Sequence, residues 1–353
     1  MKLDNLIDTI KALPAIDFAK LKNLFLSGEF DSIGSIEDFL IEKRFENGEF
    51  CPVCNDTHIV RNGHRKDGTQ KFLCRNCGKA FGITTNSITA GTKKDLAVWS
   101  KYISCMQDGL TIEASAEKCG INKNTSFTWR HKILDALQNM AGGVTLSGVV
   151  EADETFTALS YKGNHKRSHN FKMPRRPHKR GHDIYGNVGM NEYACIPCAV
   201  TREGLSIARV SNVGNISSER LSDFFHGRIA EDSVVVSDKN HIYRRFAEAN
   251  NLALVGIRHG KGSDGIYSMG HINNYHSQLK RFINHRFNGV STKYLNNYIV
   301  WHNFINWAKG TSKEKNKIFT TFVLSTLKKV RNCDLSSRAA IPFFRNEWLS
   351  VNF

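Results

Sequence analysis

The sequence lacks the features of a membrane-spanning or secreted protein. None of its apolar runs reaches the roughly 18 unbroken residues that a bilayer-spanning helix requires. The N-terminus has no basic start followed by an apolar run and a small-residue cleavage site. We therefore expect an intracellular protein. In a reducing compartment its nine cysteines are expected to be metal ligands or core residues rather than disulfides.

Acidic residues are also in short supply. The chain has 33 Asp and Glu against 49 Lys and Arg, which gives a net charge of +16 and a pI of about 9.5. A surplus of this size indicates a polyanionic partner, with nucleic acid as the first candidate. Hydrophobic residues make up 41% of the chain, which argues against disorder as a whole, and 353 residues leave room for two or three domains.

The texture of the chain changes several times and predicts a multidomain α+β fold. We expect a helical N-terminal segment over 1–48, a cysteine- and glycine-rich module over 49–86 and a helical module over 92–142. An α/β domain is expected over 147–308, because strand-length apolar runs at 148–152, 193–200, 205–210, 233–237 and 252–257 alternate with helical patterns at 218–229 and 272–285. Residues 309–353 form a tail that is helical and basic in its first half. No internal repeat is evident.

Two CxxC pairs in the 49–86 module have the spacing of metal ligands. The first pair is Cys51 and Cys54, and the second, about twenty residues later, is Cys74 and Cys77. Each pair can place two thiolates on one tight turn, and the two turns together can complete a tetrahedral site. Four thiolates suit a structural Zn²⁺ ion in a zinc ribbon, with a β-hairpin over 58–72 between the pairs. A third pair, Cys195 and Cys198, lies in an apolar strand pattern, which favours core packing over metal or redox chemistry.

The 92–142 module predicts a helix-turn-helix, although other helical hairpins have a similar pattern. Thr111 can cap its first helix, Gly120 can supply the turn, and residues 122–125 contain caps for the second helix. The second helix mixes an apolar face with donor groups, as a recognition helix in the major groove does. The predicted DNA-binding residues on it are Trp129, Arg130, His131 and Lys132.

A basic segment interrupts the α/β domain after its first strand. Between 162 and 182 it contains no acid and eight cations: Lys162, Lys166, Arg167, Lys172, Arg175, Arg176, Lys179 and Arg180. Such a run has too few apolar residues for a core of its own. It is either a solvated loop or a contact to the phosphate backbone of DNA, and the rest of the chain favours the second interpretation.

Two aspartates follow apolar strand patterns of the α/β domain. Asp153 follows the first strand and Asp238 ends another. Carboxylates on neighbouring strands can share Mg²⁺ ions, and a metal pair can clamp both oxygens of a phosphodiester exchange. Each aspartate alone could equally be a cap or a turn residue. A helix pattern begins near residue 272, and on it Asn273, His276 and Lys280 have the spacing i, i+3, i+7, which places them on one face. This face could hold a metal ligand, an amide and a cation against one phosphate, or it could be a polar surface without metal contact.

This ordered series resembles the ISXO-type insertion-sequence transposases, which are bacterial DDE-like enzymes with an N-terminal zinc ribbon. The similarity extends from about residue 45 to residue 304. Its motifs are Cys51-Pro-Val-Cys54, Asn62-Gly63-His64, Cys74-Arg-Asn-Cys77, the Thr-Trp-Arg-His-Lys-Ile-Leu run at 128–134, Asp153-Glu154-Thr155, and the Gly-Val-Ser-Thr-Lys-Tyr-Leu run at 289–295.

The resemblance implies an RNase H-like α/β catalytic domain with a mixed sheet and two divalent ions, Mg²⁺ or Mn²⁺. It places the first two catalytic residues at Asp153 and Asp238. The third position, usually Glu, falls on His276, with Asn273 beside it and Lys280 as the basic residue that follows. Asp264 or Glu154 could complete the ligand set instead.

The implied partners are double-stranded DNA, both terminal inverted repeats and target, and further copies of the chain on that DNA. The implied location is the bacterial cytoplasm, in association with the nucleoid. The implied activity is DNA cleavage and strand transfer. Two alternatives stay open: a catalytically decayed transposase that regulates by binding specific DNA, for which the missing third Glu is the best argument, and an RNase H-like nuclease without strand transfer.

Overall fold

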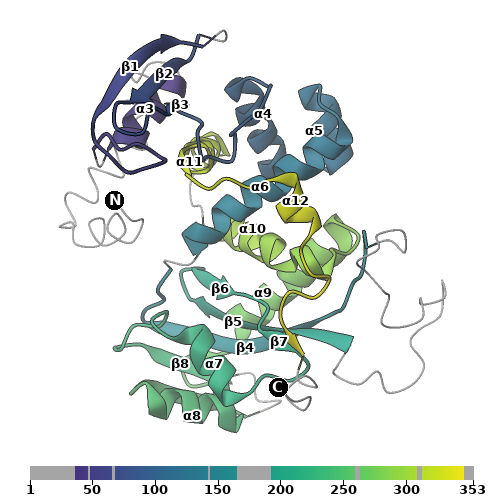
Figure 1. Cartoon of the computed structure of the whole chain (residues 1–353). Helices are drawn as coiled ribbons and strands as arrows, with labels where there is room; N and C mark the ends of the chain where they lie inside the picture. Colours follow the sequence, from purple (N-terminus) through teal and green to yellow (C-terminus); the bar gives the residue numbers. More distant parts are fainter. Residues whose placement is uncertain are drawn as a thin grey trace, which may run out of the picture. The chain divides into compact units, whose positions relative to one another are not determined.

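The computed structural model describes residues 36–46, 48–65, 68–141, 144–164, 192–258, 263–307 and 312–345. The chain divides into two compact units, shown in Figure 1: unit 1 comprises 1–143 and 309–336, and unit 2 comprises 144–308 and 337–353. Within the described ranges, no helix has the length and apolar character needed to cross a membrane.

A small antiparallel sheet opens unit 1 after α3 (Ile36–Phe45). It contains β1 (Ile59–His64), β2 (Gln70–Cys74) and β3 (Ala80–Gly82) in that order. The predicted hairpin is present, and Asn62-Gly63, a dipeptide typical of hairpin turns, lies inside β1. The β1–β2 register shifts between Arg61 and His64, and Gly63 has a φ of 65°. Glycine accepts this left-handed conformation without a steric penalty, so the pair forms a bulge.

The helices of unit 1 are α4 (Leu96–Gln107), α5 (Ile112–Cys119), α6 (Lys123–Ala141), α11 (Ser312–Ser325) and α12 (Asn332–Ser336). Thr111 caps α5 through its side chain, and Gly120 ends that helix in the left-handed conformation, as the sequence predicts. From the C-terminal tail, α11 contacts α3, α4 and α6, and α12 contacts α6. The first half of the tail is therefore helical, as predicted, and packs into unit 1.

The mixed sheet of unit 2 confirms the predicted α/β character of this part of the chain. Its main strands are β4 (Val149–Ala158), β5 (Tyr193–Thr201), β8 (Val234–Asp238) and β9 (Ala253–Ile257), with the shorter β6 (Ser206–Ala208), β7 (Asn212–Val213) and β12 (Phe344–Arg345). The order is β12-β7-β5-β4-β8-β9, with β6 paired to β5. Strand β4 is antiparallel to β5 and parallel to β8, and β8 is parallel to β9.

Helices cover both faces of this sheet. Val150 and Ala152 of β4 belong to a buried cluster with side chains of α7 (Ser218–Phe225) and α8 (His241–Ala249), among them Phe225 and Phe246. Because side chains alternate along a strand, Glu151 and Asp153 point to the opposite face. Helix α9 (Gly270–Arg281) contacts β4 and β5 there, and α10 (Leu295–Trp307) contacts β6.

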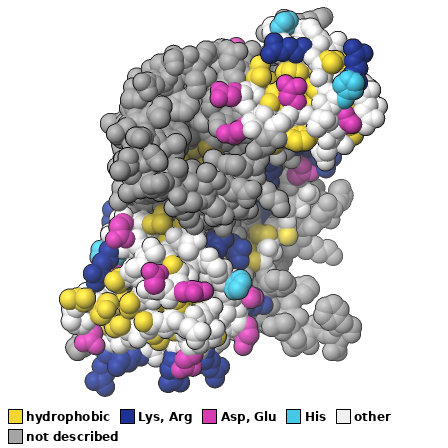
Figure 2. Space-filling view, turned by 90° about the vertical axis from the view of Figure 1, so that its left-hand side faces the viewer, with side chains coloured by type: hydrophobic (Ala, Val, Ile, Leu, Met, Phe, Trp, Pro, Cys, Tyr) yellow, Lys and Arg dark blue, Asp and Glu magenta, His cyan; other side chains and the backbone are white. Residues whose placement is uncertain are grey.

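The predicted helix at 272–285 is found as α9, extended by a π-helical turn at Phe282–Arg286. A short 3-10 turn at Thr292–Tyr294 leads into α10, and a two-stranded hairpin of β10 (Ser263–Asp264) and β11 (Tyr267–Ser268) precedes α9. Figure 2 shows Lys and Arg side chains at the lower edge of the view, and α8 itself exposes Arg244 and Arg245.

Candidate functional site

Four cysteine sulfurs from two separate turns converge in unit 1. The Sγ atoms of Cys51, Cys54, Cys74 and Cys77 all lie within 4.8 Å of one another. Cys51 and Cys77 are 3.7 Å apart and Cys54 and Cys74 are 3.6 Å apart, sulfur to sulfur. Four thiolates bound tetrahedrally at the usual Zn–S length are about 3.8 Å apart. The cluster therefore has the chemistry and the size for one Zn²⁺ ion.

The two cysteine turns share one backbone pattern. The N–H of Asn55 donates to the carbonyl of Cys51 at 2.9 Å, and the N–H of Gly78 donates to the carbonyl of Cys74 at 3.0 Å. Asn55 and Gly78 have φ values of 59° and 66°, which glycine and asparagine accept most readily. Burial raises the pKa of the Cys51 thiol, but hydrogen bonds from neighbouring backbone N–H groups outweigh it and lower the pKa to about 7.

Three of the four side chains predicted to contact DNA from α6 are buried inside unit 1. Trp129, Arg130 and His131 are only 5%, 1% and 1% exposed. The Trp129 ring stacks on Trp99 of α4 with centroids 3.9 Å apart, and Arg130 donates to the backbone carbonyl of Leu110 at 2.7 Å. Side chains with so little exposed surface cannot reach a base edge, so the prediction is corrected: all three are core residues of unit 1, and Trp129 and Arg130 connect α6 to α4 and to the turn before α5.

Among the α6 residues whose exposure is described, up to Gln138, the exposed ones lie at the N-terminal end. Asn122, Lys123, Asn124 and Phe127 are exposed there. Lys123 forms an ion pair with Glu113 of α5. These positions lie away from the apolar stripe of the helix, so the same helical periodicity could also have predicted that they are exposed. Lys132 is half-buried, and burial lowers its pKa.

In unit 2, the predicted aspartates lie on adjacent parallel strands. The last bonded pair between β4 and β8 is Glu151 with Val236. The same register, continued by two residues on each strand, sets Asp153 opposite Asp238. Residues at one level of a parallel pair face the same side of the sheet, so the two carboxylates share one face. Asp238 also accepts a hydrogen bond from the N–H of Asn240 at 3.1 Å, beside the start of α8.

Helix α9 brings the third predicted group to this face. The Nδ1 atom of His276 lies 3.9 Å from Oδ2 of Asp153, and their side chains are 11% and 27% exposed. Nε2 of His276 is buried and has no hydrogen-bond partner. Asn273 and Lys280 are exposed, three residues before and four residues after His276 on the same helix. The predicted helix face is therefore assembled as a surface that carries one buried imidazole, one amide and one ammonium group.

The pKa values of this cluster reflect buried, like-charged groups. Burial, with the charge of Asp238, raises the pKa of Asp153 to about 6, although the nearby Lys280 lowers it. Burial, with the charge of Lys280, lowers the pKa of His276 to about 4. The imidazole is thus neutral at neutral pH, the form that binds a metal. The two carboxylates repel each other, and Nδ1 of the neutral imidazole lies 3.9 Å from Asp153, so this donor set fits a divalent cation.

The two alternative ligands considered from the sequence lie elsewhere. Glu154 points to the α8 side of the sheet, where burial and the charges of Asp153 and Asp238 raise its pKa to about 7 and the Tyr243 hydroxyl partly offsets the rise. Asp264 is exposed in the β10–β11 hairpin. Within the described part of the chain, only the four cysteines place three or more ligand atoms within 4.8 Å of one another. Asp153, Asp238 and His276 are therefore near one another but not closed around a single point.

One residue of this site, Glu151, was not identified from the sequence. Its side chain is 2% exposed, and it precedes Asp153 by two positions on the same face of β4. Oε2 accepts the backbone N–H of Ile272 at 3.0 Å, and Oε1 lies 2.7 Å from Nδ1 of His271. The first N–H groups of a helix have no partner within the helix. Glu151, on a strand far away in the sequence, supplies an acceptor for the N–H of Ile272 and so fixes the start of α9 to β4.

Part of the predicted DNA contact lies outside the described residues. Lys166, Arg167, Lys172, Arg175, Arg176, Lys179 and Arg180 are all in this group. Lys162, the first cation of the basic segment, is described: its Nζ donates to the carbonyls of Asn288 and Gly289 at 3.2 and 3.3 Å. Lys162 thus connects the end of β4 to the loop after α9. Cys195 and Cys198 are both fully buried in β5, consistent with the core packing favoured from the sequence.

Comparison with known proteins finds similarity in the part of the chain that carries this site. Residues 145–304 match the ISXO2-like transposase domain. The matched stretch lies within unit 2, which is therefore similar to that domain. A relative, an uncharacterized protein in transposable element ISH50 of Halobacterium salinarum, is 24% identical over 130 residues. That match covers 36% of this chain and 43% of the relative, so the chain spans less than half of the relative's length.

The matched transposase region contains Asp153, Asp238, Asn273, His276 and Lys280. A crystal structure of a pre-cleavage Mos1 transpososome aligns with 68% of this chain and with 81% of its own chain, at 9% sequence identity. The TM-score of this alignment is 0.23, which is too low to indicate a shared fold. The resemblance predicted from the ordered motifs is supported: residues 145–304 are similar to an ISXO2-like transposase domain, and part of the chain is similar to a protein in a transposable element. The cysteine cluster, which lies outside the matched domain, fits the predicted zinc site.

Proposed function

We propose that this transposase cleaves DNA at the ends of an insertion sequence and joins the freed end to a target. One arrangement carries the proposal: the β4–β8 register, continued from the Glu151–Val236 pair, sets Asp153 opposite Asp238, and His276 lies 3.9 Å from Asp153. This is the arrangement expected for a metal-assisted exchange of phosphodiesters, in which no protein nucleophile is needed. The transposase family of the domain supports the same reaction class.

Asp153, Asp238 and His276 are the residues that would hold the divalent metal, Mg²⁺ or Mn²⁺, in an RNase H-like domain. When bound, a divalent metal lowers the pKa of an attacking hydroxyl and neutralises charge on the phosphate. Lys280 adds positive charge beside the same carboxylates, since it lowers the pKa of Asp153. Asn273, exposed one helical turn before His276, is placed to donate an amide hydrogen bond to a phosphate oxygen.

The reaction proposed for this site has two steps of the same kind. A water molecule attacks the phosphodiester at the element end, the bond to the 3′ oxygen breaks, and the departing oxygen takes a proton. The 3′-hydroxyl then gives up its proton and attacks a target phosphodiester in line, displacing the target's own 3′ oxygen. Neutral His276 cannot donate a proton near neutral pH without first gaining one, because its pKa is about 4. We assign it ligand chemistry rather than acid catalysis.

Unit 1 would select the DNA. The cysteine cluster would form a zinc ribbon, and α5 and α6 would form a helix-turn-helix that places the N-terminal end of α6 in a major groove. The exposed Lys123 and Asn124, rather than the buried Trp129, Arg130 and His131, would then meet the DNA. The basic segment 162–180 would contact the backbone. Joining two ends requires at least two copies of the chain on the DNA, so a homo-oligomer is part of the proposal.

Replacing Asn124 with alanine tests the assignment on α6. Asparagine can pair bidentately with adenine, which contributes about 1–3 kcal/mol of base discrimination. We expect Asn124→Ala to weaken binding to the element end about tenfold or more and to leave binding to unrelated duplex DNA unchanged. Lys123→Ala should weaken binding to both and reduce the salt dependence. Fluorescence anisotropy at several salt concentrations measures this, with Lys101→Ala, an exposed lysine on α4, as the control. Equal losses on both DNAs for Asn124→Ala would exclude base contact.

Replacing Glu151 tests the link between β4 and α9. Glu151→Ala leaves the Ile272 N–H buried without a partner, which costs about 1–3 kcal/mol, and frees the start of α9. Glu151→Gln keeps an acceptor oxygen for the same N–H. We expect Glu151→Ala to slow cleavage about tenfold or more through misplacement of His276 and Lys280, and Glu151→Gln to retain most of the rate.

DNA affinity should fall less than the cleavage rate in both variants, because Glu151 is buried under α9 and does not itself contact DNA. Glu248→Ala on α8 is the control, since Glu248 is exposed. A purely structural role of Glu151 would instead lower the soluble, folded fraction without changing the rate per folded molecule. Rate and folded fraction therefore have to be measured in the same preparations.

The proposed function is tested with purified full-length protein and a labelled duplex carrying the DNA that flanks the gene, in Mg²⁺ or Mn²⁺. We expect cleavage and joined products in the wild type and neither in Asp238→Ala, with element-end binding unaffected. Specific binding without cleavage in the wild type under either metal would instead identify a DNA-binding regulator. Cleavage without joined product would identify a nuclease that lacks strand transfer.

A further inference from the structure

The most exposed large hydrophobic side chain in the described part of the chain lies at the tip of a hairpin beside α9. Ile266 is 75% exposed, whereas the other four exposed side chains of this kind, all in unit 1, range from 36% to 59%. The last bonded pair of the β10–β11 hairpin is Asp264 with Tyr267, so Gly265 and Ile266 are the two residues of its turn. Ile266 is therefore at the tip and outside the core of unit 2.

The turn itself does not require an isoleucine. Gly265 has a φ of 59° and the φ of Ile266 is not positive, which is the pattern of a type II′ turn. This turn requires glycine at its first position, and Asn, Asp and Ser are the other residues that turns favour. An apolar β-branched side chain at the second position neither forms the turn nor is buried by it, which indicates contact with another molecule.

Hydrogen bonds hold the hairpin to the sheet and to α9. Nη2 of Arg202, in the turn after β5, donates to the Ile266 carbonyl at 2.6 Å. At the other end of the hairpin, the N–H of Gly270 donates to Oγ of Ser268 at 3.4 Å, and the start of α9 is bonded to β4. The tip is thus fixed relative to the helix that carries His276.

The tip lies a few base pairs from the catalytic groups along the sheet. Thr201, the residue before Arg202, pairs with Val150, three positions before Asp153 on β4. Three strand residues span about 10 Å, and the Arg202 side chain adds a few ångströms. Base pairs rise about 3.4 Å each, so a duplex that runs along β4 with its cleaved bond at Asp153 reaches Ile266 after about three to five base pairs.

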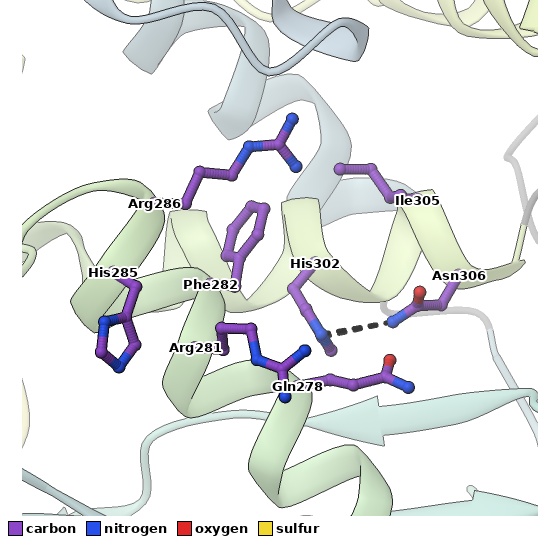
Figure 3. Close-up of a pocket in the computed structure, with 8 residues that line it drawn as sticks. All are labelled: Gln278, Arg281, Phe282, His285, Arg286, His302, Ile305 and Asn306. Atoms are coloured by element: carbon purple, nitrogen blue, oxygen red, sulfur yellow. Dashed lines mark hydrogen bonds between the residues drawn. The ribbon is translucent and has the colours of Figure 1, made fainter.

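Exposed cations lie at the opposite end of α9. They are Lys280, Arg281 and, after the π-helical turn, Arg286. Figure 3 shows Arg281 and Arg286 at a pocket of about 480 Å³ between α9 and α10. The rings of Phe282 and His302 in its lining are only 7% and 5% exposed, so this pocket presents cations but no aromatic face to a base. This end of α9 therefore suits phosphates, and the hairpin end supplies the exposed apolar group.

The surroundings of Ile266 favour DNA over a protein partner. A stable protein interface buries about 800 Å² on each partner, and among the described residues of unit 2 no second large hydrophobic side chain is exposed beside Ile266. A single isoleucine is enough to enter a base step from the minor groove. Phosphates repel Asp264 beside the tip, but its carboxylate can accept from the amino group that guanine presents in that groove. The tip thus fits base edges rather than the backbone.

We propose that Ile266 inserts between two adjacent base pairs of the element-end DNA and unstacks them, a few base pairs from the cleaved bond. The inference rests on the proposed function, since it adds a contact to the same DNA. An apolar wedge of this kind kinks the duplex at one step. A kink at Ile266, with Lys280 and Arg281 beside the phosphates at the other end of α9, sets which phosphodiester lies over Asp153 and Asp238.

The test measures base unstacking with the full-length protein and element-end duplexes that carry 2-aminopurine at one position at a time. This base fluoresces more strongly when it is unstacked, and no Mg²⁺ or Mn²⁺ is added, so that the DNA stays uncut. Ile266→Asn replaces the wedge by a polar residue that suits the turn, and Ile266→Leu keeps an apolar side chain of the same size. Leu327→Asn, at an exposed apolar position between α11 and α12, is the control.

We expect the wild type to raise the fluorescence at one position, within about five base pairs of the cleaved bond. Ile266→Asn should lose this rise and still melt with the wild type, because the side chain is exposed. Ile266→Leu and Leu327→Asn should keep the rise. A rise that persists in Ile266→Asn would overturn the proposal, as would the absence of a rise at every position on DNA that the wild type binds.

A mismatch at the same step gives a second readout. Unstacking costs least at a mismatched base, so the wild type should bind a duplex with one mismatch there about tenfold more tightly than the paired duplex. Ile266→Asn, which does not unstack the step, should bind the two duplexes alike. Equal preference for the mismatch in both proteins would contradict insertion by Ile266. A changed oligomeric state of free Ile266→Asn would contradict it too, because the tip would then contact a second copy.

Cleavage with Mg²⁺ is measured on the same DNAs, which separates this inference from the proposed function. If the wild type cleaves but unstacks no step, the wedge assignment fails and the transposase function stands. If it unstacks one step without cleaving, the wedge stands for a DNA-binding protein and the proposed function fails. Absence of binding to element-end DNA would overturn both.

Discussion

Replacing Asp153 with asparagine is expected to stabilise unit 2 and to abolish its catalysis. The pKa of Asp153 is raised to about 6, first by burial and then by the charge of Asp238. Asparagine has nearly the same shape and does not carry the buried charge. A rise of about two pKa units corresponds to at most about 3 kcal/mol, and the partial exposure of the side chain reduces this to about 2 kcal/mol. The midpoint of unfolding should rise by about 5 °C.

The pH dependence of this effect has a definite sign. The folded pKa of Asp153 lies above its unfolded value, so the folded state binds the proton more tightly. Protonation of Asp153 therefore favours the folded state of the wild type below a pH of about 4, and this contribution to the free energy of unfolding is lost as the pH rises through about 6. The difference between Asp153→Asn and the wild type should be small at pH 4, grow up to pH 6 and stay constant above it. Calorimetry without added Mg²⁺ measures it.

The matched control is Asp232→Asn, an exposed aspartate just before β8, for which we expect no change in stability. Cleavage by Asp153→Asn should fall about a thousandfold, because a neutral amide is a poor ligand for a divalent cation. A variant that melts lower than the wild type at pH 7, or that cleaves normally, would refute the assignment of Asp153 as a buried metal ligand.

Loss of zinc is the second large effect. A structural zinc site contributes about 10–16 kcal/mol of apparent folding free energy in small zinc modules. The sheet of β1, β2 and β3 has a small core, chiefly Phe72 and Phe81 with rings 5.5 Å apart. We expect Cys74→Ser to lose the bound zinc, to unfold residues 49–86 and to weaken binding to the element end, while unit 2 stays folded.

Elemental analysis and NMR spectra of the full chain measure this outcome. Cys333→Ser is the control, because Cys333 is exposed and lies in α12, outside the cluster. It should keep one zinc ion per chain, as the cysteine cluster predicts. A Cys74→Ser protein that keeps both its zinc and a folded 49–86 region would show that the cluster does not carry the stability of the module.

The features that could be predicted from the sequence are those in which local spacing sets the geometry. The four cysteines were predictable because each CxxC turn is a local structure, and their sulfurs lie within 4.8 Å of one another. The sheet that carries Asp153 and Asp238 was predictable because apolar runs of strand length precede both aspartates. The face of α9 followed from a period of 3.6 residues.

Contacts between distant segments were not predictable in this way. The buried state of Trp129 depends on Trp99 of another helix, and no pattern within α6 shows which face that ring will cover. Glu151 was missed because its partners, His271 and Ile272, are about 120 residues away. In a strand that also carries Glu154 and Asp153, a further carboxylate has no local mark of its role.

The most direct test of the catalytic site is Mn²⁺ binding by the full-length, zinc-loaded protein on element-end DNA, followed by electron paramagnetic resonance. Wild type, Asp153→Asn, Asp238→Asn and the Asp232→Asn control are titrated side by side. We predict that wild type and control bind Mn²⁺ alike and that either site variant weakens binding about a hundredfold. Equal Mn²⁺ affinity in all four proteins would contradict a metal site shared by Asp153 and Asp238.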